Sequence, residues 1–313
     1  MPTEEKKSNP MLAVLSALIA NLIIAIMKTI VGFISGSQSI INEAIHSFVD
    51  VTDQALLFIG DKSAARASSE KHNFGYGRDK YFFAFIVSVL LFSIGGLYGI
   101  MESVEKLHHL GSHVNPKDMI LPIVLLAFSG VVEFISLQVD FKLAKSHRKP
   151  GESLWQFIHN TTIAELIVCI LEDLAAVIGC LIGLTGVTLT LITGNAIFDA
   201  LGGLGIGILL LGIAIILAVE FHSLILGESL SSGDLAKINE ILASKPEVAH
   251  VLNIKTSYLG PETLLIALKL DIETESCSNA DIINDLEAQI RAYFSDETVY
   301  IFIEEDDYDP EYI

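Results

Sequence analysis

Four polar residues interrupt an apolar segment near the N-terminus and could hold a metal ion. In the stretch NEAIHSFVDVTD, Glu43, His46, Asp50 and Asp53 follow one another at steps of three, four and three. On a helix these steps place all four side chains on one stripe. A charge inside a bilayer costs about 2.5–3.5 kcal/mol even on a lenient insertion scale, so the stripe must face protein, water or an ion.

Two of these residues, His46 and Asp50, form an H-x-x-x-D pair on one face of the predicted helix. Imidazole and carboxylate groups are both good ligands for a divalent metal such as zinc. Polar groups also pair across membrane helices without any metal. The pair alone therefore does not separate a metal site from a helix contact.

A second cluster lies in AELIVCILEDLAAVIG, which holds Glu165, Cys169, Glu172 and Asp173 at steps of four, three and one. Neither this apolar segment nor the one around His46 contains Lys or Arg, so protonation or a bound cation must compensate the acids. Together the two segments offer enough imidazole, thiol and carboxylate groups for the four ligands of tetrahedral zinc. The sequence therefore predicts a metal site inside a membrane.

The predicted metal site is more typical of a transporter than of a hydrolytic enzyme. The chain contains no H-E-x-x-H motif and no Gly-rich phosphate loop. A cation site at membrane depth on several helices is typical of transport. An intramembrane metalloenzyme is a further hypothesis, and it would need Glu165 or Glu172 to activate a zinc-bound water.

Six apolar runs must position these residues, and each is long enough to cross a hydrocarbon core of roughly 30 Å. The chain has 313 residues, 51% of them hydrophobic, and a mean hydropathy of +0.56. A polar leader, residues 1–10, carries no cleavage site, which predicts that the first span is retained. The expected spans are 11–34, 40–61, 81–104, 118–140, 162–187 and 198–225.

Lys and Arg are unevenly divided among the connections between these spans. They occur in the leader and cluster in the second and fourth connections, whereas the first and fifth connections have none. Because cytoplasmic loops carry the excess of Lys and Arg, both termini are predicted to be cytoplasmic. We expect an integral multi-pass protein of the cell (inner) membrane, embedded in the lipid bilayer through a six-helix transport domain, residues 11–226.

Residues 227–313 differ in composition and predict a separate C-terminal domain. They hold 19 acidic residues against five Lys and Arg, so most of the net charge of −19 lies here, and this balance argues against nucleic acid as a partner. Apolar patterning predicts two helices on one face of a three-stranded sheet. The predicted fold class is an α-helical membrane protein with six transmembrane helices, followed by a small α+β domain. Its expected helices are 231–244 and 279–294, and its expected strands are 249–259, 263–273 and 298–304.

Four segments carry a resemblance to a known family. They are SGSQSIINEAIHSFVDVTDQALLFIG, the loop and helix that begin HNFGYGRDKYFF, FDALGGLGIGILLLGIAIILAVE, and VAHVLNIKTSYLGPE. Together they resemble the cation diffusion facilitator family, membrane exporters of divalent metals. The resemblance implies a homodimer that exchanges Zn²⁺ for protons, with no cofactor and no enzymatic reaction. It also implies that residues 227–313 form a ferredoxin-like cytoplasmic dimerisation domain.

The resemblance implies a transport site with two ligands on the second helix and two on the fifth. His46 and Asp50 match the first pair, and Asp173 matches one member of the second pair. Cys169 stands where many members have His or Asp, so the fourth ligand is either Cys169 or Glu172. Glu172 is favoured, because a Cys among apolar neighbours more often packs as a small hydrophobic residue. A His ligand favours zinc over manganese, with Co²⁺, Fe²⁺, Mn²⁺ and Cd²⁺ as alternative substrates.

Other family metal sites are incomplete in this chain. His72 matches a metal ligand of the loop, but Tyr76 replaces its partner. His250 matches a position that binds metal in some members, whereas Asn279 and Ile303 stand where partner histidines would be expected. We therefore expect His72 and His250 to be weak metal ligands at most.

Acids outside the ligand set are candidates for carrying protons or for contacting other helices. Glu43 and Glu165 are the candidate proton-path residues of the second and fifth spans. Glu133 and Asp140 on the fourth span belong to the same class. Asp199 follows Gly194 and Asn195 at the start of the sixth span, where a cap on its own helix is the simpler role.

A non-transporting membrane sensor or scaffold is an alternative to a transporter. Such a protein would carry a full ligand set in its C-terminal domain and an incomplete one in its membrane helices. In this chain the predicted full ligand set lies in the membrane helices, and the set in the C-terminal domain is incomplete. The sequence therefore favours an exporter.

Overall fold

The structure, a computed structural model, describes residues 10–109, 116–149, 151–273 and 278–308, and for residues 10–18, 20 and 116 it describes the backbone alone. Residues 1–9 of the predicted leader lie outside the described residues. Two compact units make up the chain, and the domain boundaries predicted at residues 10 and 226 stay predictions. The first unit comprises Met1–Ile59, Phe83–Ile158 and Glu165–Glu220, and the second comprises Gly60–Phe82, His159–Ala164 and Phe221–Ile313.

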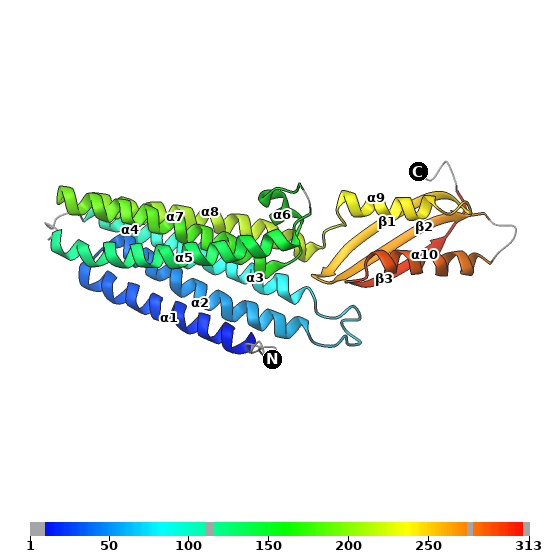
Figure 1. Ribbon diagram of the computed structural model, residues 1–313, viewed down its shortest axis with the longest axis horizontal. Helices are drawn as coiled ribbons and strands as arrows, with labels where there is room; N and C mark the ends of the chain where they lie inside the picture. The colour runs from blue at the N-terminus through cyan, green and yellow to red at the C-terminus, as the bar shows by residue number, and fades with distance from the viewer. Residues whose placement is uncertain (1–9, 110–115, 150, 274–277, 309–313) are drawn as a thin grey trace, which may run out of the picture. The chain divides into compact units, whose positions relative to one another are not determined.

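Long helices correspond to the six predicted spans, and Figure 1 shows these ribbons running side by side. Most of their ends lie within four residues of the predictions because the apolar runs that define them are long and end in polar or turn residues. The exceptions are the helices of the fourth and fifth predicted spans, which continue seven and six residues beyond the predicted ends at 140 and 187. The helices are α1 (Pro10–Ser35), α2 (Gln38–Ala64), α3 (Asp79–Leu90) continuing through η1 (Leu91–Tyr98) into α4 (Gly99–His108), α5 (Ile120–His147), α7 (Ala164–Thr193) and α8 (Ile197–Leu226). A short helix, α6 (Leu154–Asn160), and the 3-10 turn η2 (Pro116–Met119) were not predicted.

Four of these helices are long and apolar enough to cross a membrane, as judged over the described residues. They span Asp79–His108, Lys117–His147, Ala164–Thr193 and Ile197–Leu226. The described apolar part of α1 is shorter, Asn21–Ser35. The helix α2 carries the polar stripe and is not in this set. The chain is thus a multi-pass α-helical membrane protein in which α2 is the most polar of the long helices.

The third span is interrupted by the π-helical segment η1, which contains the glycine pair Gly95–Gly96. A Cβ atom built on Gly96 would lie 2.9 Å from Cα of Leu211 in α8. A Cβ atom on Gly207 of α8 would lie equally close, 2.9 Å, to the backbone nitrogen of Ile100. Glycine at these positions therefore allows α8 to pack directly against the backbone of the third span.

The N-terminus of α2 is capped by another helix. The carboxylate of Asp199, in the first turn of α8, accepts hydrogen bonds from the backbone N–H groups of Gln38 (2.6 Å) and Ser39 (3.1 Å). It also accepts the Ser37 hydroxyl (2.7 Å) and lies 3.1 Å from Nζ of Lys106. The expected cap on its own helix was wrong, because the side chain turns toward the unsatisfied amides of α2.

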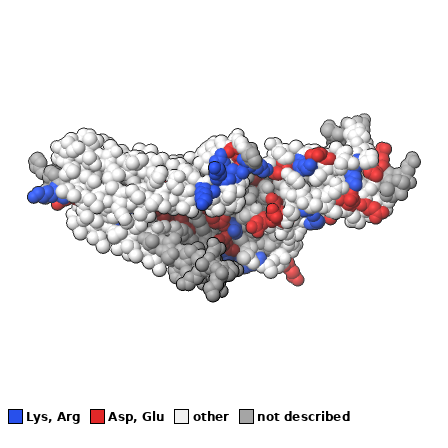
Figure 2. Space-filling model, in the orientation of Figure 1, with Lys and Arg blue, Asp and Glu red and all other residues white. Residues whose placement is uncertain are grey.

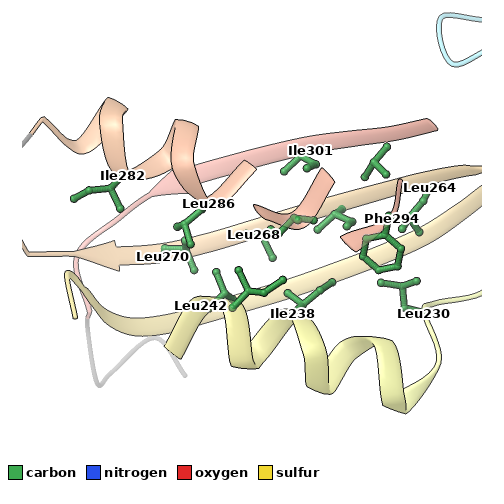
Figure 3. Packing of buried hydrophobic residues seen from close by; sticks show 14 of the residues in the cluster. Leu230, Ile238, Leu242, Leu264, Leu268, Leu270, Ile282, Leu286, Phe294 and Ile301 are labelled. Atoms are coloured by element: carbon green, nitrogen blue, oxygen red, sulfur yellow. The ribbon is translucent and has the colours of Figure 1, made fainter. Parts of the chain in front are cut away.

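The C-terminal part of the second unit has the predicted order of helices and strands, α9 (Ser232–Ala243), β1 (Val248–Gly260), β2 (Thr263–Ile272), α10 (Asn279–Tyr293) and β3 (Thr298–Glu305). The sheet order is β1-β2-β3, with β1 antiparallel and β3 parallel to β2. Every second residue of β2 is buried from Leu264 to Leu270, and α9 and α10 contact each other over this face. Figure 3 shows their side chains meeting in one apolar layer, including Ile238, Leu286 and Phe294.

The loop between α2 and α3, which holds HNFGYGR, also belongs to the second unit and packs on the β1–β2 turn. Arg78 donates hydrogen bonds from Nη2 to Oγ of Ser257 (3.1 Å) and to the carbonyl of Tyr258 (3.2 Å). A Cβ atom on Gly77 would lie 3.0 Å from Cα of Gly260. The glycine and the arginine of this motif thus serve a backbone contact and its hydrogen bonds.

Candidate metal site on α2 and α7

Three carboxylates from two helices converge in the first unit. Asp50 and Asp53 of α2 and Glu172 of α7 each place one carboxylate oxygen within 4.8 Å of the other two. The side chain of Asp50 is 17% exposed, whereas Asp53 is fully buried and Glu172 is 8% exposed. The group is therefore closed on most sides, and Asp50 is its most exposed member.

The carboxylates of this group are poorly compensated by the protein. Neither oxygen of Asp53 receives a hydrogen bond from an amide, hydroxyl or cationic group among the described residues. Oε1 of Glu172 likewise receives none. Three acids this close repel one another, so they must hold protons or share a cation. Zinc–oxygen bonds measure about 2.0–2.2 Å. Small side-chain rotations would bring these oxygens around one divalent ion.

His46 lies one helical turn before Asp50 and is 1% exposed. Its Nδ1 atom is 3.1 Å from Oδ1 of Asp50, within ion-pair distance, and Nε2 has no hydrogen-bond partner among the described residues. The ring is adjacent to the three-carboxylate group but not part of it. A neutral imidazole placed in this way could complete four ligands after a side-chain rotation.

The expected ligands on α7 lie on different faces of that helix. Glu172 points into the group, whereas Asp173 and Cys169 do not belong to it. Successive residues of an α-helix are rotated by about 100°, so Glu172 and Asp173 cannot face the same neighbour. The carboxyl group of Asp173 instead reaches Ser136 and Asp140 of α5. Of the two sequence candidates for the fourth ligand, Glu172 is the one that the structure brings to Asp50.

Glu43, a candidate proton-path residue, is paired with a lysine that sequence analysis overlooked. Nζ of Lys28 in α1 donates to Oε2 of Glu43 (3.1 Å) and to Oγ of Ser47 (2.8 Å), and all three side chains are buried. Lys28 belongs to α1 and lies outside the two apolar segments that carry the acids. A lone Lys inside the apolar run IAIMKTIVGF was the signal that could have found this pair.

The remaining candidates lie outside the three-carboxylate group. Glu165 is in the first turn of α7, seven residues before Glu172. His72 is exposed in the loop after α2, and its ring contacts that of Tyr76 with centroids 4.6 Å apart. His250 lies on β1, where Nδ1 is 3.0 Å from Oδ2 of Asp271 and the ring stacks on Tyr308. Each histidine therefore has a local structural contact.

Charge is distributed differently on the two parts of the molecule. In Figure 2 the surface of the long helices is mostly uncharged, with acidic atoms visible in one narrow strip. Charges of both signs cover the C-terminal part on the same face. An uncharged belt suits hydrocarbon, and acids within such a belt need a reason other than solubility.

Comparison with known proteins agrees with an ion-translocating membrane domain. Residues 14–226 match the family described as the cation efflux transmembrane domain. The proton-coupled zinc antiporter SLC30A9, mitochondrial, of Mus musculus is 30% identical over 266 residues, which cover 83% of this chain and 46% of that protein. Metal tolerance protein C4 of Arabidopsis thaliana is 28% identical over 260 residues, with 83% and 56% covered.

A third relative has nearly the same length as this chain. An uncharacterized transporter of Methanocaldococcus jannaschii is 21% identical over 275 residues, covering 88% of this chain and 89% of that protein. By contrast, the chain spans about half the length of the mouse and Arabidopsis relatives. The family match, residues 14–226, includes both helices that carry the three-carboxylate group.

Proposed function

This chain belongs to the cation efflux family, and from that premise we propose that it exports a divalent metal cation, with Zn²⁺ as the first candidate, in exchange for protons. The mouse relative is named as a proton-coupled zinc antiporter and the Arabidopsis relative as a metal tolerance protein. The metal ion is cargo in this proposal. No bond-making reaction and no resident cofactor are part of it.

The observation that carries the proposal is the uncompensated acid group on α2 and α7. Asp50, Asp53 and Glu172 lie within 4.8 Å of one another. The nearby cation, Lys28, is engaged by Glu43 and Ser47. A divalent ion would neutralise most of the charge of the three carboxylates and give their buried oxygens a partner.

Exchange of metal for protons follows from the chemistry of these ligands. Metal and protons compete for the same lone pairs on His46 and the carboxylates, so metal binding releases protons. Histidine titrates near neutral pH, which suits a group that must give up and regain a proton in each cycle. Rocking of α2 against α7 would expose the site alternately to the two sides of the membrane. Protons arriving from the far side would then displace the metal.

Location and assembly are further parts of the proposal. The distribution of Lys and Arg supports cytoplasmic N- and C-termini. The cell (inner) membrane is the location that we propose. A homodimer formed through the C-terminal sheet and helices is supported by the resemblance to dimeric cation exporters. Crosslinking of the full chain in native membranes would measure the oligomeric state, and labelling of both termini in sealed vesicles would measure the orientation.

Metal flux in proteoliposomes tests the proposed function. In vesicles that hold the full-length protein and a pH gradient, Zn²⁺ is expected to move in the direction opposite to the flow of protons. Flux measurements with Co²⁺, Cd²⁺, Mn²⁺ and Fe²⁺ give the substrate range. The variants His46→Ala, Asp50→Ala and Glu172→Gln are expected to lose transport. The matched control is Asp61→Asn, a half-exposed acid of α2 that pairs with Lys80 outside the group. Full transport by His46→Ala or Asp50→Ala would remove the proposal.

The same assay separates the alternative functions. A membrane sensor or scaffold would bind metal without flux in any gradient. A metalloenzyme would turn over a substrate without moving metal. The local contacts of His250 with Asp271 and Tyr308 favour a structural C-terminal domain over a metal-reporting one.

A further inference from the structure

We propose that Asp53 is a specificity-determining metal ligand, which widens the range of the site toward hard cations such as Mn²⁺. This inference rests on the proposed function, since it concerns the same site. The ligand set implied by the family resemblance has two positions on the second helix, His46 and Asp50. Asp53 would be a third ligand on that helix, one turn beyond the pair.

The contacts of Asp53 do not fit a structural role. Asp199, a buried structural acid of the same unit, accepts hydrogen bonds from two backbone amides and a hydroxyl and lies against a lysine. Asp53 is equally buried, yet neither of its oxygens receives such a bond from a described residue. A buried carboxylate without donors is destabilising, because its lost hydration is not replaced. A cation held between Asp53 and its neighbours removes that destabilising effect.

The carboxylate of Asp53 points toward the other two acids of the group. One of its oxygens lies within 4.8 Å of oxygens from Asp50, on the same helix, and from Glu172, on the facing helix. Residues three apart on a helix share a face, so Asp50 and Asp53 present two carboxylates to α7 together. Asp53 is thus aimed into the same space as the two acids that would bind the transported ion.

The composition of the resulting ligand set determines which metals it suits. His46 with Asp50, Asp53 and Glu172 gives one imidazole nitrogen and three carboxylates. Carboxylate oxygens suit Mn²⁺ and other hard ions, imidazole suits zinc and iron, and thiolates suit soft metals. Cys169 lies outside the group, so the set has no soft ligand. Removing one carboxylate should weaken binding of Mn²⁺ more than binding of Zn²⁺.

Equilibrium metal binding to the full-length protein in detergent micelles tests this inference. The measured quantity is the ratio of the dissociation constants for Mn²⁺ and Zn²⁺ at fixed pH and salt. Asp53→Asn keeps the size of the side chain and removes its charge, and it is expected to raise this ratio about tenfold, the lower end of the effect of losing a metal-supporting group. Asp53→Glu keeps a carboxylate and is expected to leave the ratio within about threefold of the wild type. Asp61→Asn makes the same chemical change elsewhere on α2 and should not alter it.

The outcomes separate the inference from the proposed function. An unchanged ratio in Asp53→Asn, or a larger loss of Zn²⁺ than of Mn²⁺, would overturn the role of Asp53. Asp53→Ser provides a second truncation if the Asn variant does not purify as a monodisperse protein. Zn²⁺ flux by the wild type is measured separately in vesicles. Absence of flux with a raised ratio would overturn the transport proposal while the ligand role of Asp53 stands.

Discussion

The interior of the long helices and the interior of the C-terminal domain are built from different kinds of side chain. Buried positions in the helices include Lys28, Glu43, His46, Asp53 and Asp199. In the C-terminal domain the described buried side chains are apolar except that of Asp271, whose Oδ2 lies 3.0 Å from Nδ1 of His250. Buried charge costs free energy unless it is paired or bound to an ion. Stability alone therefore explains the interior of the C-terminal domain but not the interior of the long helices.

The polar groups of the helical interior divide further into two kinds. Lys28 with Glu43, and Asp199 with the amides of α2, form hydrogen-bonded contacts that hold helices in place. In the group of Asp50, Asp53 and Glu172, both oxygens of Asp53 and Oε1 of Glu172 have no hydrogen-bond partner among the described residues, and Asp50 lies 3.1 Å from Nδ1 of His46. The first kind is structural and the second is open to a ligand. Substitutions should distinguish the two kinds by whether they change stability or metal handling.

Removing Lys28 is expected to have the largest effect on stability. Lys28→Met leaves the buried carboxylate of Glu43 without its cation, and breaking a buried ion pair by one partner costs about 3–5 kcal/mol. The double variant Lys28→Met with Glu43→Gln removes both charges and should recover part of that loss. Unfolding of the full chain in mixed detergent micelles measures the free energies.

The control for this prediction is Lys142→Met, which removes an exposed lysine of α5 and should change the free energy of unfolding by less than about 0.5 kcal/mol. If the double variant is as unstable as the single one, the Lys28–Glu43 pair is not the source of the loss. The distinction between acids that hold helices in place and acids that are open to a ligand would then not hold for Glu43, which is paired with Lys28.

An apolar substitution in the C-terminal domain should destabilise that domain without affecting metal binding. Leu286 of α10 is fully buried in the core cluster, and Leu286→Ala is expected to cost about 2–5 kcal/mol through the cavity that it leaves. Hydrogen exchange of the β2 amides in the full-length protein measures the local loss. Val251→Ala, at an exposed position of β1, is the control. Loss of Zn²⁺ binding in Leu286→Ala would contradict the division of roles.

The outline of the fold was predictable because long apolar runs and strict alternation are strong local signals. The six spans and the helices and strands of the C-terminal domain follow these signals closely. The π-helical segment η1 and the helix α6 were missed, since neither produces a change in hydrophobic pattern. The glycines of η1 serve contact with α8, which no local pattern shows.

The candidate site was predictable in its helices and less so in its side chains. Spacing alone places Asp50 and Asp53 on one stripe, but which face of α7 meets that stripe depends on how the two helices pack. Glu172 and Asp173 are neighbours in the sequence, and only packing selects Glu172 for the group. The Lys28–Glu43 pair joins residues on two different helices, so its register could not be read from either helix alone.

Asp199 offers a test of intermediate size in the helical interior. Asp199→Ala removes the acceptor for the first amides of α2, and loss of a helix cap costs about 0.5–2 kcal/mol. Asp199→Asn keeps one acceptor oxygen and loses the ion pair with Lys106, so a smaller cost is expected. Hydrogen exchange at the start of α2 and unfolding in micelles measure the effect. Equal costs for the two variants would mean that the charge, and not the cap, is what matters.

The smallest expected effect concerns the surface pair of Lys245 and Asp285 in the C-terminal domain. Lys245 donates a hydrogen bond to the carboxylate of Asp285, which lowers the pKa of Asp285, with help from Gln289, and raises the pKa of Lys245. Because the folded pKa of Asp285 lies below its unfolded value, near 3.9 for a free Asp, its contribution is present above that value. It is lost as the pH falls through the folded pKa.

The wild type should therefore lose slightly more protection of the C-terminal amides than Asp285→Asn between about pH 5 and the folded pKa of Asp285. The difference should shrink in high salt, because exposed ion pairs are screened. Hydrogen exchange across an acid pH series measures it in the full chain. At neutral pH the two proteins should bind Zn²⁺ equally, since this pair belongs to the part whose charges lie on the surface. If Asp285→Asn changed Zn²⁺ binding at neutral pH, surface charge in the C-terminal domain would affect the metal site. That result would contradict the separate roles of the helical interior and the C-terminal domain.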